Sequence, residues 1–377
     1  MNIKRRGFIG LSAAGIAAVT LAACGDDTAT TPGSTTGTDG SAEPGTAAGK
    51  KVGVAMPTQT SERWIADGEA VKSQLTDAGF EVDLQFANDD IPTQSQQVDQ
   101  MITKGVNVLI IAAIDGTALA PQLDAAAAAG IKVISYDRLI RDSENVDFYV
   151  TFDNFKVGVA QAESLVSGLE TKGAGPHNVE LFAGSLDDNN AFFFFNGAMS
   201  ILQPKIDAGD IVVKSGQTTI EQAAILRWQQ ETAQRRMDDL MTAHYGSDKV
   251  HGVLSPYDGI SRGIITSLQN AGYKLEDFPI VTGQDAEIGS VKLIVEGLQF
   301  STIFKDTRDL AAEAVRVATD LLEGKEPEAN DTETYDNGKK VVPSYLLDVI
   351  TVTKENVTEA LIDTEYWTQE QVDAGVA

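Results

Sequence analysis

Charged and hydrogen-bonding side chains recur immediately after short β-branched runs in this chain. Carboxylates in such places accept hydrogen bonds from hydroxyl groups, arginine, lysine and asparagine donate them, and an indole ring covers an apolar C–H face. Together these groups suit a neutral, polyhydroxylated ring. The residues placed in this way are Arg63, Trp64, Asp137, Arg138, Asp188, Asn190, Tyr257, Asp285 and Lys305.

Pairs of carboxylates could instead act as acid and base in glycoside hydrolysis, for example Asp187 with Asp188 or Asp137 with Asp285. A general acid needs a raised pKa, however, and carboxylates beside arginine and lysine should stay ionised. We therefore expect a binding protein that is not an enzyme, with a surface-anchored glycoside hydrolase as the alternative.

The sequence offers few of the residues that bind metals, phosphates or cofactors. It holds one cysteine and three histidines, and a phosphate site would need glycine-rich backbone nests. Neither a G-x-G-x-x-G run nor a G-x-x-x-x-G-K-S/T run occurs. We expect no metal and no cofactor, and we interpret His177, His244 and His251 as structural.

The elements that must position these residues alternate between strands and helices. Helical segments such as 66–77, 93–104, 119–129 and 286–296 are followed by glycine, which is typical of a helix end. Nine strands are predicted, at 52–56, 82–86, 106–111, 131–136, 179–182, 211–213, 250–254, 280–282 and 301–304. Apolar strands alternating with helices indicate an α/β protein with parallel sheets, and nine strands fit two sheets. Ligands of such sheets bind beyond the carboxyl ends of the strands.

The composition excludes several classes of partner. Lys and Arg total 29 and Asp and Glu total 55, so the formal charge is −26 over 377 residues. Nucleic-acid binding needs a basic surface, and so does docking on anionic lipid through charge. Hydrophobic residues make up 42%, which is enough for a core.

The N-terminus has the features of an export signal. A basic start precedes an apolar stretch that ends at Ala23, and this stretch is too short for a membrane span. The small residues before Cys24 resemble a bacterial lipobox, in which the cysteine is acylated. We expect residues 1–23 to be a signal peptide and 24–50 a lipid-anchored flexible linker. The protein would then work at the outer face of the cell membrane or in the periplasm. Export through the general or the twin-arginine route stays open.

The folded part resembles the periplasmic sugar receptors of ABC transporters, specifically the multiple-monosaccharide and D-xylose-binding group. The resemblance extends over nearly all of residues 51–365. Six strings carry it, in order: Ser61-Glu62-Arg63-Trp64, Tyr136-Asp137-Arg138-Leu139-Ile140, Thr151-Phe152-Asp153-Asn154, Asp188-Asn189-Asn190-Ala191, Ser255-Pro256-Tyr257-Asp258-Gly259 and Gly283-Gln284-Asp285-Ala286.

This resemblance implies two Rossmann-like lobes, a type I periplasmic binding protein, with three crossing segments that form a hinge. The crossings are expected near Asp153, Lys305–Asp306 and Val342–Ser344. The implied N-terminal lobe comprises residues 51–153 and 307–342, and the implied C-terminal lobe comprises 154–306 and 343–377.

The resemblance also implies a ligand and its contacts. The ligand would be a monosaccharide of the xylose, glucose, galactose or arabinose class, which a monomeric receptor delivers to an ABC permease or presents to a membrane sensor. The implied sugar contacts are Arg63, Trp64, Asp137, Arg138, Asp188, Asn190, Trp228, Tyr257, Asp285 and Lys305.

The roles of some residues are not decided by the sequence. Tyr257 departs from the asparagine of xylose and of galactose/glucose receptors, and Trp64 and Trp228 could be core aromatics. No contact is assigned to Asp115, and at most one side chain of the run Phe192–Phe195 is expected to reach the cleft.

The proposed anchor gives a direct prediction. Because Cys24 is the single cysteine, Cys24→Ser should abolish lipidation and move the protein from the detergent phase to the aqueous phase of a detergent phase separation. A wild-type protein that already partitions into the aqueous phase would show the lipobox interpretation to be wrong.

Overall fold

The computed structural model describes residues 49–377. The predicted signal peptide, Cys24 and nearly all of the predicted linker lie outside the described residues and stay predictions. Within the described part, no helix is both long enough and apolar enough to cross a membrane.

The first lobe is built on a six-stranded parallel sheet with the order β11-β5-β4-β3-β1-β2. Its strands are β1 (Lys51–Met56), β2 (Glu81–Phe86), β3 (Val108–Ile111), β4 (Lys132–Tyr136), β5 (Phe148–Phe152) and β11 (Ser344–Leu347). Its helices are α1 (Glu62–Asp77), α2 (Ile91–Thr103), α3 (Ala120–Ala128) and α10 (Thr307–Leu322).

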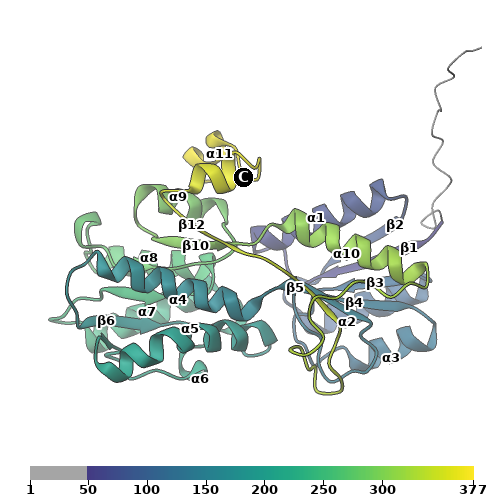
Figure 1. Ribbon diagram of the computed structural model, residues 1–377, viewed down its shortest axis with the longest axis horizontal. Helices are drawn as coiled ribbons and strands as arrows, with labels where there is room; N and C mark the ends of the chain where they lie inside the picture. Colours follow the sequence, from purple (N-terminus) through teal and green to yellow (C-terminus); the bar gives the residue numbers. More distant parts are fainter. Residues whose placement is uncertain (1–48) are drawn as a thin grey trace, which may run out of the picture. The chain divides into compact units, whose positions relative to one another are not determined.

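Both faces of this sheet are covered, because alternate strand residues point to opposite sides. Val108 and Ile110 belong to the core that α1 and α10 cover, whereas Leu109 and Ile111 belong to the core under α2 and α3. Figure 1 shows α1 and α10 together on one side of the strands and α2 and α3 on the other. Burial on both faces explains why the strands are continuous apolar runs.

The second lobe contains a four-stranded parallel sheet with the order β7-β6-β8-β9. Its strands are β6 (His177–Leu181), β7 (Ile211–Val212), β8 (Gly252–Leu254) and β9 (Ile280–Val281), and β10 (Ser301–Phe304) pairs antiparallel with β12 (Ile350–Thr353). Its α-helices are α4 (Asn154–Glu170), α5 (Asn189–Ala208), α6 (Ile220–Ala223), α7 (Gln230–His244), α8 (Asp258–Asn270), α9 (Ile288–Glu296) and α11 (Gln369–Ala374).

Most expected elements are present, and all four predicted helix ends have the backbone that glycine favours. The glycines after α1, α2, α3 and α9 have positive φ: 94° at Gly79, 71° at Gly105, 73° at Gly130 and 82° at Gly297. All nine predicted runs contain strands, whereas β5, β11 and β12 were not predicted as strands, although Thr151-Phe152 in β5 carried part of the resemblance.

The third crossing lies further along the chain than expected. Residues 343–377 were assigned to the second lobe, but β11 pairs with β5, with Ser344 opposite Tyr149 and Leu347 opposite Phe152. The chain therefore leaves the first lobe after Leu347, between β11 and β12. Only the pairing with β5 reveals this, because nothing in the sequence near residue 344 marks the segment as an edge strand.

Candidate functional site

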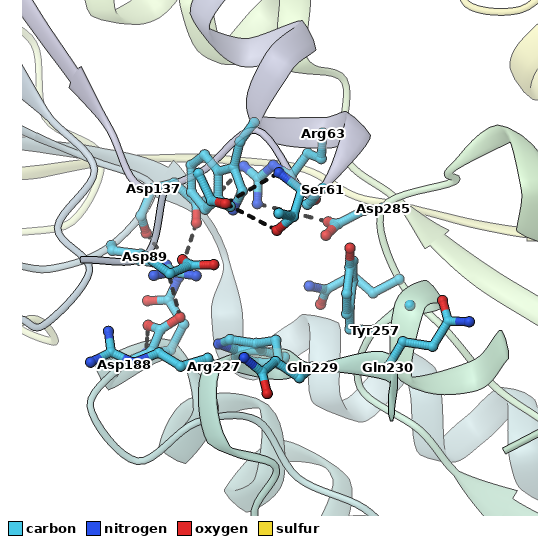
Figure 2. Close-up of a pocket in the computed structure, with 18 of the residues that line it drawn as sticks. Ser61, Arg63, Asp89, Asp137, Asp188, Arg227, Gln229, Gln230, Tyr257 and Asp285 are labelled. Carbon is cyan, nitrogen blue, oxygen red and sulfur yellow. Dashed lines mark hydrogen bonds and ion pairs between the residues drawn. The ribbon is translucent and has the colours of Figure 1, made fainter. Parts of the chain in front are cut away.

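A cavity of about 490 Å³ lies where the two lobes meet, at the carboxyl ends of their parallel strands. Residues of both lobes line it, and Figure 2 shows their polar side chains directed into it. All ten of the implied sugar-contact residues are among those that line it: Arg63, Trp64, Asp137, Arg138, Asp188, Asn190, Trp228, Tyr257, Asp285 and Lys305.

Arg63 is the central cation on the first-lobe side. It stands in the first turn of α1, and its Nε donates to Asp67 Oδ2, one turn later, at 2.7 Å. Its Nη2 donates at 2.5 Å to Oδ2 of Asp137, the residue directly after β4. Tyr136 completes the arrangement by donating from its hydroxyl to Asp67 Oδ1 at 2.6 Å. The guanidinium is thus fixed by two carboxylates.

Lys305 and Asp285 continue the arrangement from the second lobe. Lys305 follows β10, and its Nζ lies 3.0 Å from Asp285 Oδ1 and 3.9 Å from Asp137 Oδ2. Asp285 Oδ1 also lies 3.8 Å from Arg63 Nη1, and Figure 2 shows its carboxylate directed towards Arg63. We call the resulting series of alternating charges the charge chain; its members are Asp67, Arg63, Asp137, Lys305 and Asp285.

Every member of the charge chain is buried, with exposed fractions of 7% or less. Burial alone would raise the pKa of Asp137, but Arg63 and Lys305 outweigh it and lower the pKa to about 2. Burial raises the pKa of Asp67 to about 6, because the attraction of Arg63 is partly offset by the negative charge of Asp137. The two carboxylates that hold one arginine therefore titrate differently.

Arg138 and Asp188 form a second ion pair across the cavity, with Arg138 Nε 3.0 Å from Asp188 Oδ2. Asp188 is also the N-cap of α5, where its side chain accepts from the backbone N–H of Asn190 at 2.9 Å. Burial raises the pKa of Asp188, although Arg138 opposes that rise. The expectation that a neighbouring cation keeps such carboxylates ionised is thus supported for Asp137, whereas for Asp188 burial is the stronger effect.

Asn190 joins this pair to the charge chain. Its Nδ2 donates to the backbone oxygen of Asp137 at 2.9 Å, and its Oδ1 accepts from the hydroxyl of Tyr149 at 3.1 Å. Asn190 belongs to the second lobe and both partners to the first. The ion pair of Arg138 with Asp188 and the charge chain are therefore connected across the lobes.

The aromatic residues of the lining lie in different surroundings. Trp64 is 6% exposed and has the guanidinium carbons of Arg63 and Arg138 at 4.6 and 5.0 Å from its ring centre. Trp228 meets Phe194 and Tyr257 edge to face, with centroids 6.3 and 6.2 Å apart. Trp64 belongs to the core as well as to the cavity wall.

The structure shows where the Phe192–Phe195 run and Asp115 lie, whose roles the sequence left open. Within the run Phe192–Phe195, Phe194 alone lines the cavity, while Phe193 packs on Tyr335 and Phe195 belongs to a core cluster. Asp115 does not line the cavity; its carboxylate accepts from the backbone N–H and hydroxyl of Thr117, as in a turn.

Tyr257 uses its hydroxyl away from the ligand space. The hydroxyl donates to Glu287 Oε1 at 2.7 Å, and Glu287 Oε2 also accepts from Arg262 Nη2 at 2.6 Å. The ring of Tyr257 therefore forms cavity wall, whereas an asparagine at this position would offer two polar groups. This departure makes that side of the cavity less polar.

Several residues in or behind the cavity lining were not predicted as site residues from the sequence. Asn88 and Asp89 line the cavity directly after β2, where the rule that favours strand ends would have found them. Gln284 is 3% exposed, and its Oε1 has no hydrogen-bond partner among the described residues. Asp67 lies mid-helix and behind the lining, so no strand-end signal marks it.

Backbone strain is concentrated around this cavity. Of the nine non-glycine residues with positive φ in the described part of the chain, six line it: Asn88, Asp89, Asp137, Arg227, Trp228 and Asp285. Such conformations cost free energy and persist where the surrounding structure enforces them, typically at functional sites. Across residues 49–377, no group of three or more His, Cys, Asp or Glu side chains is arranged to hold a metal ion.

Two α/β lobes with a cavity at their strand ends define a periplasmic binding protein of type I. Residues 52–326 match the family described as periplasmic binding protein domain, and the chain belongs to this family.

The chain is similar to several named proteins. The chain is 58% identical over 324 residues to the multiple sugar-binding periplasmic receptor ChvE of Rhizobium radiobacter, covering 85% of this chain and 92% of that protein. It is 36% identical to the D-xylose-binding periplasmic protein of Escherichia coli, covering 83% and 89%. A solute binding protein of an ABC transporter from Clostridium phytofermentans, with bound β-D-glucose, matches with a TM-score of 0.82 and 45% identity, covering 86% and 100%. The resemblance seen in the six strings is thereby confirmed.

The raised pKa of Asp67 predicts a pH dependence of stability. The unfolded carboxyl has a pKa of about 3.9, and the folded one of about 6. The folded state therefore binds the proton more tightly, so its stability falls as the pH rises from about 4 to about 6. Asp67→Asn should remove this fall, which amounts to about 3 kcal/mol.

Denaturant unfolding of both proteins at several pH values between about 4 and 7 measures this effect. The exposed Asp77 at the end of α1 supplies the control, and Asp77→Asn should follow the wild type. A constant stability difference between wild type and Asp67→Asn over this range would contradict the prediction.

Proposed function

We propose that this protein is an extracytoplasmic lipoprotein that captures a neutral monosaccharide between its lobes and delivers it to an ABC permease. The observation that carries the proposal is the charge chain, which brings donors and acceptors of both lobes to one cavity. A ring with hydroxyl groups on every side can bond to both lobes at once.

The ion pairs favour a neutral ligand over an acidic one. An anionic sugar would need a cation free to pair with it, but each cation that lines the cavity already has a carboxylate partner. These pairs are Arg63 with Asp137, Arg138 with Asp188, Arg227 with Asp187, Arg262 with Glu287, and Lys305 with Asp285.

The named relatives support the same ligand class. One is called a multiple sugar-binding receptor, another binds D-xylose by its name, and a third holds β-D-glucose. We infer that pentoses and hexoses of the xylose and glucose class bind here, with the ten implied contact residues around the ring. Delivery to a permease and the anchor at Cys24 rest on the family resemblance and on the lipobox.

Binding without catalysis is the role that the site supports best. The pKa of Asp137, lowered by Arg63 and Lys305, makes it a hydrogen-bond acceptor and a poor general acid. A glycoside hydrolase remains the alternative because burial raises the pKa of Asp188. Prolonged incubation with glucosides and analysis for released sugar distinguishes the two roles; release above a protein-free control would contradict the receptor proposal. Presentation of bound sugar to a sensor would use the same site.

Calorimetric titration with D-glucose, D-xylose, D-galactose, L-arabinose and D-glucuronate tests the ligand class. At least one neutral sugar should bind with micromolar or tighter affinity, and glucuronate should bind at least a hundredfold more weakly than that sugar. Tight binding of glucuronate, or no binding of any neutral sugar, would overturn the proposal.

Asp285→Ala should nearly abolish this binding. Its carboxylate lines the cavity, and we expect it to accept from ring hydroxyls. Losing two charged hydrogen bonds of about 1.5–3 kcal/mol each would weaken binding by roughly two to four orders of magnitude. The remaining charge chain holds two carboxylates and two cations, so we expect the fold to survive.

Because Asp285 has φ 90°, a second variant separates backbone strain from lost contacts. Asparagine tolerates positive φ better than alanine, so Asp285→Asn should melt closer to the wild type and still lose most of the affinity. Binding by either variant within threefold of wild type would remove Asp285 from the site.

A further inference from the structure

Two helices of opposite lobes meet at their N-termini beside the cavity. Helix α1 begins after Ser61 in the first lobe, and α9 begins after Glu287 in the second. Neither N-cap side chain bonds to the backbone of its own helix, although serine at this position usually does so. Their hydrogen-bonding capacity is used elsewhere.

The side chains at these two helix starts bond to the opposite helix start. Ser61 Oγ donates to Glu287 Oε1 at 2.9 Å. In return, Glu62 Oε2 accepts from the backbone N–H of Ile288, the first residue of α9, at 3.0 Å. The free amide at the start of α9 is thus capped by a carboxylate of the other lobe.

We propose that these four residues form a cross-lobe latch, which holds the lobes together and thereby sets the affinity for ligand; its two glutamates, Glu62 and Glu287, do so without lining the cavity. The cross-lobe latch consists of Ser61, Glu62, Glu287 and Ile288. The proposal rests on the proposed function, because the affinity concerned is that for the sugar.

The second-lobe half of the latch is rigidly held. Glu287 is 2% exposed, its Oε2 accepts from Arg262 Nη2 at 2.6 Å, and its backbone N–H donates to Asp258 Oδ2 at 2.9 Å. Its Oε1 also accepts from the hydroxyl of Tyr257, a residue of the cavity wall. Glu287 is therefore fixed by its own lobe whether or not the first lobe is near.

The first-lobe half supplies the bonds that depend on closure. If the lobes separate, Ile288 loses its carboxylate acceptor and Ser61 loses Glu287, while the bonds of Glu287 to Arg262 and Tyr257 remain. The latch therefore stabilises only the arrangement in which the lobes meet. Because Glu62 does not line the cavity, its contribution reaches the ligand through the fraction of protein that is closed.

This mechanism has a distinctive signature. Apparent affinity falls in proportion to the closed fraction, so a weaker latch should lower the affinity for every ligand by the same factor. A residue that touches the sugar would instead change one sugar more than another. Glu62 is thus a positioning residue, and the ratio of two affinities separates the two roles.

The test compares Glu62→Ala with Glu62→Gln, which keeps a neutral acceptor for the Ile288 N–H. The control is Glu69→Ala in the same helix, because Glu69 is exposed and its nearest cation, Lys72, is 3.9 Å away. Titrations use the two best-binding neutral sugars, thermal melts check folding, and small-angle scattering measures the radius of gyration without sugar.

We expect Glu62→Ala to weaken both sugars by the same factor of roughly ten, about 1.4 kcal/mol, with Glu62→Gln intermediate and Glu69→Ala like the wild type. Unchanged affinity in Glu62→Ala, or unequal losses for the two sugars, would overturn the latch. If the wild type binds no sugar, the proposed function fails. The latch is then decided by scattering: a larger radius for Glu62→Ala than for wild type supports it, and an equal radius refutes it.

Discussion

Charged groups cannot be buried unless opposite charges accompany them, and this constraint shapes the whole centre of the molecule. Breaking a buried ion pair by removing one partner costs about 3–5 kcal/mol, so each member of the charge chain depends on its neighbours. Asp67, Arg63 and Asp137 come from the first lobe, and Lys305 and Asp285 from the second. Lys305 lies within ion-pair distance of Asp137, so the positions of the lobes and the electrostatics of the cavity are linked.

The same constraint explains the strained backbone around the cavity. Functional groups that follow the strands must turn sharply to converge on one volume, and Asp137 after β4 and Asp285 after β9 do so with positive φ. Trp228 reaches the same volume from an irregular turn, also with positive φ. Such conformations are tolerated because hydrogen bonds from both lobes hold the groups in place. Asp137, for example, has its backbone oxygen bonded by Tyr149, Thr151 and Asn190. The cavity is therefore preorganised rather than loosely assembled, which lowers the entropic cost of binding.

The sequence predicted those features whose physical cause lies within a short stretch of the chain. Strands such as β3 are apolar throughout because both of their faces are buried. A polar residue directly after a parallel strand lies at the edge of the sheet where ligands bind. Both signals are local in the sequence. Asp67 and β11 were missed because their roles are not local. The role of Asp67 depends on its bonds to Arg63, one turn earlier in α1, and to Tyr136 in β4. The role of β11 depends on its pairing with β5. Trp228 came from the resemblance alone, because its place depends on an irregular turn.

The edge position of β11 has a consequence for the order in which the protein folds. The sheet that begins with residue 51 is completed by residues 344–347, so the first lobe gains its last strand only after the second lobe has been synthesised. Contacts of such high sequence separation form late and slow folding. The growing chain would therefore carry an unpaired edge at β5 until nearly its full length is available. Unpaired sheet edges recruit other chains, so this topology leaves β5 open to wrong pairing until β11 is available.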